Sequence, residues 1–290
     1  MTLAPRAVLV HRRTELDELL ARHGTRGQAA FFLATRGRRL DEVEQRHAAT
    51  TAAIAEVMAV VPLDWRRGTV ERDDLARFLF APDDVVIVVG QDGLVANVAK
   101  YLDGQRVIGI NSDPDRNPGV LVAHPPSAAG DLLRGTGAAE RTMVEAITDD
   151  GQSLLALNEI YLGHASHQTS RYTLTPADGD AERQASSGLI VATGTGSTGW
   201  CRSAWLERHS PLALPDPNER RLLWFVREAW PSPATGTANT EGELADARLA
   251  ITVESDRLVA FGDGIEADHL SLSWGQTVTI GCATRRLRLA

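Results

Sequence analysis

An aspartate between two glycines follows an apolar run in the first half of the chain. The run DDVVIVV (83–89) is typical of a buried strand and ends at Gly90, Gln91, Asp92 and Gly93. A strand that stops at glycines presents backbone N–H groups and one carboxylate at the C-terminal edge of a sheet, where open α/β folds bind ligands. The turn predicts phosphate binding, with Asp92 as general base for an alcohol that attacks a phosphoryl group. As an isolated tetrapeptide, it fits a simple helix cap better.

A second polar pair, Asn158 and Glu159, follows the apolar run LLAL (154–157). Polar side chains in such surroundings need hydrogen-bond partners or a ligand. A neighbouring amide and carboxylate suit the two hydroxyls of a ribose, with Glu159 accepting and Asn158 donating or accepting. A plain polar pair at the edge of a sheet is the alternative interpretation.

A turn rich in glycine and hydroxyl groups, TGTGSTG (193–199), follows the strand-like GLIVA (188–192). It matches the GxGxxG dinucleotide fingerprint, but no second strand arrives soon after it, which disfavours a Rossmann site. We expect the turn to lead into a helix over TGWCRSAWLER (198–208), whose free N–H groups and hydroxyls can hold a phosphate or a ribose.

The overall composition excludes several classes of protein. The formal net charge of −8 argues against non-specific nucleic-acid binding. No apolar run is long enough to span a membrane and the N-terminus lacks a signal pattern, so we expect a cytoplasmic protein. Lys100 is the only lysine, which excludes a GxxxxGK[ST] loop and thus Walker-type NTPases. We expect its side chain to be solvated on a helix over 94–102, and Cys201 and Cys282 to be buried thiols.

Strands and helices alternate in the first part of the chain. We expect strands at 7–10, 84–89 and 106–110, and helices at 14–23, 41–61, 94–102 and around 71–79. This alternation predicts a doubly wound α/β unit with a parallel sheet covered on both faces. The long helix is predicted to bury Val43, Ile54, Val57 and Val60.

After Ile110 the chain changes character. Turn formers crowd residues 111–119, and short strand-like segments dominate the rest of the chain, which predicts a mostly antiparallel all-β domain. The expected strands are 140–148, 152–163, 169–175, 188–193, 247–253, 256–262, 270–274, 276–281 and 285–290. Long loops are expected at 210–221 and 227–243 because both are rich in Pro, Gly and Asn. We therefore predict an α/β nucleotide-binding domain over 1–119 and an all-β dinucleotide-binding domain over 120–290.

Five segments, taken in order, resemble the NAD kinase family and specifically its mitochondrial-type branch. They are GQDG (90–93), VIGINSDPDRNPG (107–119), ALNEIYLG (156–163), SSGLIVATGTGST (186–198) and RLVAFGDGIEADHLSLSWGQTVTIG (257–281). The resemblance covers most of the chain, which looks like a bacterial member of that group. It implies an α/β domain followed by an all-β domain, with the active site between them.

The resemblance assigns roles to individual residues. Asp92 falls on the catalytic aspartate of the family's GGDG motif, with Gly90, Gln91 and Gly93 in its phosphate-handling turn. Asn158 and Glu159 fall on the pair that holds a ribose of NAD. The residues that match the second glycine-rich turn, around the adenosine, are Thr193, Thr195, Gly196, Ser197 and Thr198. Gly262-Asp263-Gly264 lies near a late DG element, although it also fits an ordinary hairpin turn.

The implied reaction transfers the γ-phosphoryl group of ATP to the 2′-hydroxyl of NAD and gives NADP. Without a phosphate-loop lysine, the triphosphate must be neutralised by Mg²⁺ and arginine, and Arg116 is the leading arginine candidate. We identify no protein metal site. The family usually associates through its β domain, so a homodimer is expected. Whether NADH replaces NAD, or polyphosphate replaces ATP, is left open.

Two residues depart from the family's pattern. Gln91 replaces its second glycine, and Leu94 stands where a threonine commonly follows. If position 91 required a positive φ, glutamine would cost on the order of 1 kcal/mol and could obstruct a phosphate. Two alternatives therefore stand beside NAD phosphorylation: a related kinase for a lipid or sugar alcohol, and an NAD(P)-binding sensor that has lost phosphoryl transfer.

Overall fold

The computed structural model describes residues 4–177 and 179–290. The chain divides into two compact units, of which the first extends to Ala139 and includes Arg288–Ala290, and the second comprises Glu140–Leu287. Residues 120–139 belong to the first unit because Ala129 and Leu133, in the short helix α5 (Ala129–Arg134), are buried in its core. The functional division at residue 119 stays a prediction.

The first unit is built on a parallel sheet. Its strands lie in the order β2 (Arg66–Glu71), β1 (Arg6–His11), β3 (Asp84–Gly90) and β4 (Arg106–Asn111), all parallel. The last residues of the chain add a further parallel strand, pairing Arg288 with Arg106 and Leu289 with Val107. The sequence did not reveal β2, whose exposed, arginine-rich start hides the strand pattern.

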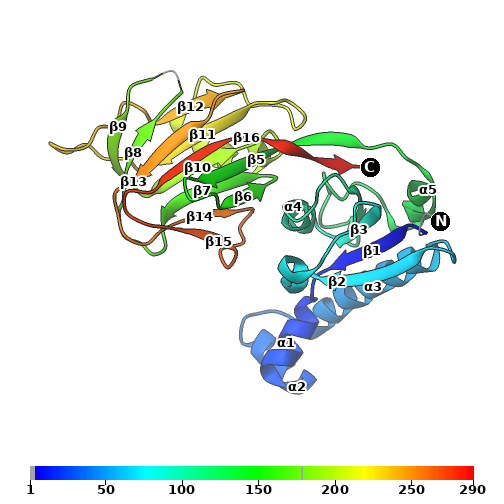
Figure 1. The fold of residues 1–290 in the computed structure, drawn as a ribbon. Coiled ribbons are helices and arrows are strands. Elements are labelled where there is room, and N and C mark those ends of the chain that lie inside the picture. Colours follow the sequence, from blue (N-terminus) through cyan, green and yellow to red (C-terminus); the bar gives the residue numbers. More distant parts are fainter. Residues whose placement is uncertain (1–3, 178) are drawn as a thin grey trace. The chain divides into compact units, whose positions relative to one another are not determined.

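Both faces of this sheet are covered. The long helix α3 (Leu40–Ala59) lies along it (Figure 1) and packs Ala53 and Val57 against the core. On the sheet, Val8 and Val10 alternate with Ala7 and Leu9, and all four are buried. Residues that alternate along a strand point to opposite faces. The predicted doubly wound α/β unit is therefore confirmed.

The remaining helices of the first unit are short. They are α1 (Glu15–His23), α2 (Arg26–Ala34), α4 (Asp92–Ala99) and the 3₁₀ turns η1 (Arg72–Arg77) and η2 (Pro126–Ala128). The prediction of a helix around 71–79 was thus right in place but wrong in type. The prediction for Val60 was wrong, because it follows the end of α3 and is exposed.

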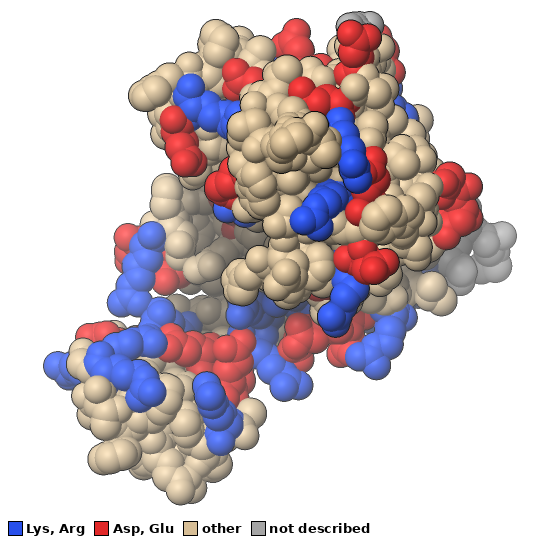
Figure 2. Space-filling view, turned by 90° about the vertical axis from the view of Figure 1, so that its left-hand side faces the viewer, with Lys and Arg blue, Asp and Glu red and all other residues tan. Residues whose placement is uncertain are grey.

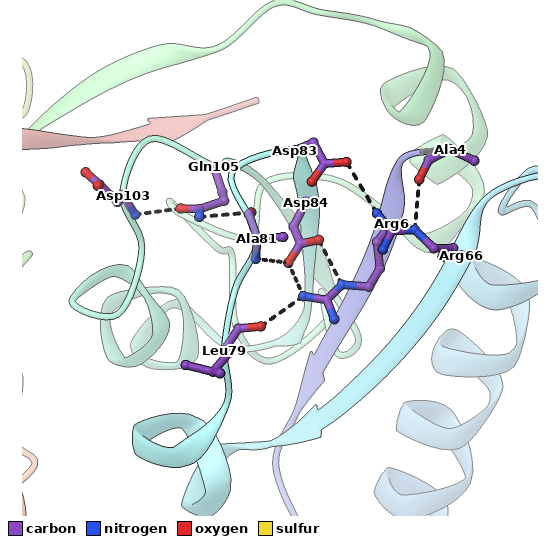
Figure 3. A network of polar contacts seen from close by, with 9 residues as sticks. All are labelled: Ala4, Arg6, Arg66, Leu79, Ala81, Asp83, Asp84, Asp103 and Gln105. Carbon is purple, nitrogen blue, oxygen red and sulfur yellow. Dashed lines mark hydrogen bonds and ion pairs between the residues drawn. The ribbon is translucent and has the colours of Figure 1, made fainter. Parts of the chain in front are cut away.

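A polar network ties the N-terminal ends of the strands together (Figure 3). The Arg6 guanidinium donates to both carboxylate oxygens of Asp84, at 2.8 and 2.6 Å, and to the carbonyl of Leu79 at 2.9 Å. The Ala81 amide also donates to Asp84, at 2.7 Å. Gln105 extends the network by donating to the Ala81 carbonyl at 3.1 Å. Every polar group of this buried carboxylate is paired within the fold.

The second unit consists of antiparallel strands, as predicted. One sheet has the order β12-β11-β10-β7-β14-β15, and β16-β13-β8-β9 form the other, to which β5 and β6 are attached. The bounds are β5 Ala139–Thr148, β6 Ser153–Ala156, β7 Glu159–His164, β8 Ser170–Thr175, β9 Glu182–Ser186, β10 Gly188–Ala192, β11 Leu222–Arg227, β12 Glu241–Leu244, β13 Leu249–Val253, β14 Leu258–Gly262, β15 His269–Leu272 and β16 Thr277–Leu289.

The apolar side chains of both sheets form one core, which includes Ile160 and Leu162 of β7 and Ile251 of β13. The helix α6 (Trp200–Arg208) follows β10 and packs Cys201 against Ile190. The strands β9, β11 and β12 were not predicted. The two segments predicted at 276–281 and 285–290 form the single long strand β16.

Charged side chains of both signs share the surface. Figure 2 shows Lys and Arg interspersed with Asp and Glu on the face in view, without a large basic patch. Many arginines are paired with carboxylates, such as Arg38 with Glu15 at 2.5 Å and Arg248 with Glu145 at 2.9 Å. Within the described residues, no helix combines the length and apolar composition that crossing a membrane requires.

Candidate active site

Asp92 lies at the C-terminal edge of the parallel sheet in the first unit. Strand β3 ends at Gly90, Gln91 is the N-cap of α4, and Asp92 is the first residue of that helix. Gly90 pairs with Asn111, the last residue of β4. The GQDG turn and the loop after Asn111 therefore leave the sheet from neighbouring strands, at the position expected from the sequence.

The Asp92 carboxylate is held by backbone amides. The amide of Val120 donates to both oxygens, at 3.0 and 2.9 Å, while the amides of Leu121 and Val122 donate to Oδ1 at 2.8 and 2.9 Å. Three consecutive amides thus orient the acid. Oδ2 accepts only one of these hydrogen bonds and retains the capacity for another.

The loop that supplies these amides is fixed by Asn111 and two glycines. The Asn111 side chain donates to the Asn117 carbonyl at 2.7 Å and accepts from the Asp113 amide at 2.9 Å. A Cβ at Gly109 would lie 1.9 Å from the Leu121 carbonyl oxygen, and Gly119 has φ +70°. Both positions exclude a side chain. They were missed as site residues, although a glycine inside a strand signals close backbone approach.

Arg116 is exposed on this loop, between the anchored residues Asp113 and Asn117. Its amide donates to the Asp113 carbonyl at 3.3 Å. The predicted phosphate-binding arginine therefore belongs to the same short segment whose amides hold Asp92.

Gln91 sits at the start of the helix without backbone strain. Its φ of −115° and ψ of 164° are extended values that any residue adopts, and the residue is exposed. The position does not need a positive φ, so the strain considered for Gln91 is absent. Gln91 directly precedes Asp92 in the chain and is exposed.

Asn158 lies in a break between β6 and β7 in the second unit, and Glu159 is the first residue of β7. We expected one strand over 152–163, but β6 ends at Ala156 and β7 begins at Glu159. The two amides in the break, of Leu157 and Asn158, donate to the carboxylate of Asp263 at 2.8 and 2.7 Å. Asn158 thus lies in a turn that Asp263 holds, and Glu159 begins the strand that follows it.

Thr193 joins this turn to the glycine-rich segment. Its hydroxyl donates to the Leu157 carbonyl at 2.6 Å and accepts from the amides of Thr195 and Gly196 at 3.1 and 3.3 Å. Its own amide donates to the Asn158 carbonyl at 2.9 Å. The structure therefore brings Asn158 and the TGTGST turn into direct contact.

Gly196 makes this contact close. A Cβ added there would lie 2.2 Å from the carbonyl oxygen of Asn158, so only glycine fits. The turn continues as the 3₁₀ helix η3 (Gly196–Thr198) and leads into α6, which begins at Trp200. The Ser197 hydroxyl donates to the Thr193 carbonyl at 3.1 Å, and Thr198 is exposed.

Thr195 has a buried hydroxyl that the protein leaves unused. The residue is 6% exposed, and its Oγ1 has no hydrogen-bond partner among the described residues. A buried hydroxyl without a partner is costly. At this turn, a hydroxyl of a bound nucleotide is a suitable partner.

Glu159 carries an unusual charge environment. Its burial and the nearby Asp263 carboxylate raise its pKa from an ordinary 4.5 to about 7. The Asp263 amide donates to the Glu159 carbonyl at 3.1 Å, which brings the two acids together. Perturbed acids of this kind cluster at functional sites. From the sequence, Gly262-Asp263-Gly264 also fitted an ordinary hairpin turn. The φ of Asp263 is 54°, which is a left-handed turn conformation.

The side chain of Lys100 is buried, contrary to the prediction. We expected a solvated side chain, but the residue is only 7% exposed, with its ammonium group 5.3 Å from the centre of the Tyr101 ring. Helix α4 is buried almost all round, from Leu94 to Ala99, so its last turn offers no water-facing side. The prediction was wrong because it assumed a one-sided helix.

The fold of this chain is similar to those of solved NAD and NADH kinases. The chain resembles an NAD kinase of Archaeoglobus fulgidus solved in complex with ATP, with a TM-score of 0.58 and 16% identity over 98% of this chain and 92% of that one. The parallel α/β unit and the antiparallel β unit of this chain therefore have the fold of that NAD kinase. No family model matches the sequence.

Curated relatives agree with this class. Human mitochondrial NAD kinase 2 is 32% identical over 167 residues, which are 40% of this chain and 38% of that protein. The NAD kinase of Chlorobaculum tepidum is 28% identical over 213 residues, or 71% of each chain. The chain thus spans about two fifths of the human protein in this match. Its sequence is thus similar to NAD kinases over these segments, and its fold is similar to that of a solved NAD kinase.

Proposed function

We propose that the protein transfers the γ-phosphoryl group of ATP to the 2′-hydroxyl of NAD and produces NADP. The observation that carries the proposal is the turn of Asn158 and Glu159, which Thr193 and Asp263 hold against the glycine-rich segment. An amide and a carboxylate fixed together suit a pair of ribose hydroxyls. A lipid or a simple sugar alcohol would not need such a turn beside a nucleotide-binding segment.

In this reaction the ribose oxygen attacks the γ-phosphorus, and the bond to the β-phosphate oxygen breaks to release ADP. Asp92 accepts the proton that leaves the 2′-hydroxyl, through the free capacity of Oδ2. The amides of 120–122 keep the carboxylate in one orientation, which lowers the entropic cost of reaching the reactive geometry.

The proposal assigns further substrate contacts to individual residues. Gly90, Gln91, Gly93 and Arg116 handle the phosphates of ATP, while Glu159 and Asn158 hold the ribose of NAD. The buried hydroxyl of Thr195, with Thr193, Gly196, Ser197 and Thr198, accommodates the adenosine part of the dinucleotide. The Arg116 guanidinium suits its role because it pairs with phosphate oxygens in a fixed fork.

Magnesium enters this scheme as part of the MgATP substrate. Within the described residues there is no group of three or more His, Cys, Asp or Glu side chains that could hold a metal ion. Mg²⁺ at phosphoryl-transfer sites is commonly held by one or two carboxylates together with the substrate phosphates and water. The donor set is compatible with an ion that arrives on the triphosphate and neutralises its charge.

The remaining assignments extend the same proposal. We assign the protein to the cytoplasm and expect a homodimer, which light scattering on the purified protein would test. NADH is an acceptor candidate beside NAD, and polyphosphate a donor candidate beside ATP.

One observation favours a second function. The Asp92 carboxylate already accepts four hydrogen bonds from the loop, which is also what a structural acid would do. In that case the protein would bind NAD(P) as a sensor without transferring phosphate.

Incubation of the purified protein with NAD, ATP and Mg²⁺, followed by an enzymatic assay for NADP, separates the two functions. Substitution of ATP by other triphosphates or polyphosphate, and of NAD by NADH, defines donor and acceptor. NADP formation that disappears without Mg²⁺ supports the kinase. Binding of NADP, detected by a thermal shift, without any turnover supports the sensor.

A further inference from the structure

Asp263 connects the two strands that flank the proposed ribose-binding pair. Its carboxylate accepts the amides of Leu157 and Asn158, and its own amide donates to the Glu159 carbonyl. We propose that Asp263 is a positioning residue for the dinucleotide, which fixes Asn158 and Glu159 in the geometry that grips the ribose. The inference rests on the proposed function and adds to it a residue that touches no substrate.

Asp263 satisfies two backbone amides that the strands leave without a partner. Leu157 is fully buried and lies between β6 and β7, outside either strand. A buried amide without a partner costs about 1–3 kcal/mol. Asp263 satisfies this amide and the next one at once, with one oxygen for each. An asparagine has only one acceptor oxygen and would leave one of the two amides facing an NH₂ group.

The backbone conformation at the hairpin tip also favours an aspartate at position 263. Asp263 has φ 54°, a left-handed conformation that Gly, Asn and Asp adopt most readily. The preceding Gly262 packs tightly, since a Cβ there would lie 2.7 Å from the Cβ of Ala156. The hairpin tip must therefore lie directly against the end of β6, and aspartate meets both the conformational and the two-acceptor requirement.

Asp263 also affects the ionisation of Glu159. The Asp263 charge acts on Glu159, whose pKa is raised by burial first and by Asp263 second. Among the described residues, Cys201 also interacts with Glu159, and burial raises the pKa of this thiol to about 11, so it is neutral at physiological pH. Removal of the Asp263 charge should therefore lower the pH at which Glu159 ionises.

The test compares Asp263→Asn with a matched control, Glu182→Gln. Glu182 lies in the same unit and likewise accepts two consecutive amides, of Ala238 at 2.9 Å and Asn239 at 3.2 Å, but it contacts neither Asn158 nor the glycine-rich turn. For Asp263→Asn we expect the KM for NAD to rise about tenfold, as for one lost hydrogen bond. The KM for ATP should stay within about twofold, and the pH midpoint of the NAD dependence should move downward.

A merely structural role gives a different result. It would reduce the amount of active protein, and so the apparent kcat, in both variants, without a selective rise in the KM for NAD. Unchanged KM values for NAD in Asp263→Asn, or an equal rise in Glu182→Gln, would overturn the proposal.

Asp263→Glu covers the case in which Asp263→Asn does not fold. It keeps the charge and both acceptors but displaces them by one methylene, so a smaller rise in the KM for NAD is expected, and no rise would count against Asp263. If the wild type makes no NADP, the proposed function fails by itself. Calorimetric titration with NADP then decides the inference, because weaker binding by the Asp263 variants supports it and equal or absent binding contradicts it.

Discussion

Strand β3 begins and ends beside an acid, and the two acids are held in opposite ways. At its start, Asp84 is fully buried and its charge is matched by the Arg6 guanidinium (Figure 3). Past its end, Asp92 is partly exposed and is held by neutral backbone amides. A cation neutralises a carboxylate within the fold, whereas amides orient it and leave its charge to act on something else. Under the proposed function, the acid at one edge serves stability and the acid at the other serves chemistry.

The largest expected effect comes from Asp92→Asn. The variant keeps an acceptor oxygen for the loop amides but cannot take a proton, so NADP formation should fall by about 10² to 10⁴. Dinucleotide affinity, measured by calorimetry, should be unchanged. Asp131→Asn is the control, because Asp131 is an exposed acid of the same unit, on α5. Turnover close to that of the wild type would show that Asp92 is as structural as Asp84.

Asp84→Asn should produce the converse result. Breaking the buried pair with Arg6 should destabilise the protein by about 3 kcal/mol, near the lower end of the cost of such a change, since part of Arg6 reaches water. Urea unfolding measures this loss. The KM values of the folded fraction should not change, and a selective loss of catalysis without loss of stability would break the comparison.

Glu159 sharpens the comparison, because among the described residues it is an acid whose pKa is shifted by burial and by another acid, Asp263. Below about pH 7 it takes up a proton, so the affinity for NAD should fall up to about tenfold per pH unit toward pH 6. Its contribution to stability has the opposite sign. The stabilisation that Glu159 contributes is fully present below about pH 4.5 and is lost as the pH rises to about 7. Measurement of the KM for NAD and the melting temperature across this range checks both signs, and Glu159→Gln should flatten both curves.

Gln91→Gly should have the smallest effect. The extended backbone at this position carries no strain, so the melting temperature should change by no more than a few degrees, equivalent to about 1 kcal/mol. If the Gln91 side chain obstructs the phosphate, the KM for ATP should fall. A large gain in stability would mean that the backbone beside Asp92 is strained after all.

The sequence predicted the fold where local signals were strong. The β-branched run before Gly90 and the turn formers after Ile110 were enough to define a parallel α/β unit and a β-rich remainder. Strand β2 was missed because four of its six residues are charged or glycine and it is recognisable only by its pairing with β1. The break between β6 and β7 was missed because its cause, Asp263, lies far away along the chain.

The candidate site was predictable in its residue types but not in their mutual contacts. Asn158 and the turn from Thr193 were both named, yet the close approach of Gly196 to the Asn158 carbonyl depends on tertiary structure. The amides that hold Asp92 carry no sequence signal at all, since any non-proline residue at 120 to 122 supplies the same N–H group.

The return of the chain end to the first sheet has a practical consequence for dissecting the protein. The Ala290 amide donates to the Val107 carbonyl at 2.8 Å, and the His124 ring lies 3.1 Å from the Ala290 carbonyl. A fragment that stops at Ala139 would leave the start of β4, at Arg106 and Val107, without its neighbouring strand and open to self-association. An excised first unit therefore needs the last few residues grafted on or supplied as a peptide, and an affinity tag is better placed at the other terminus.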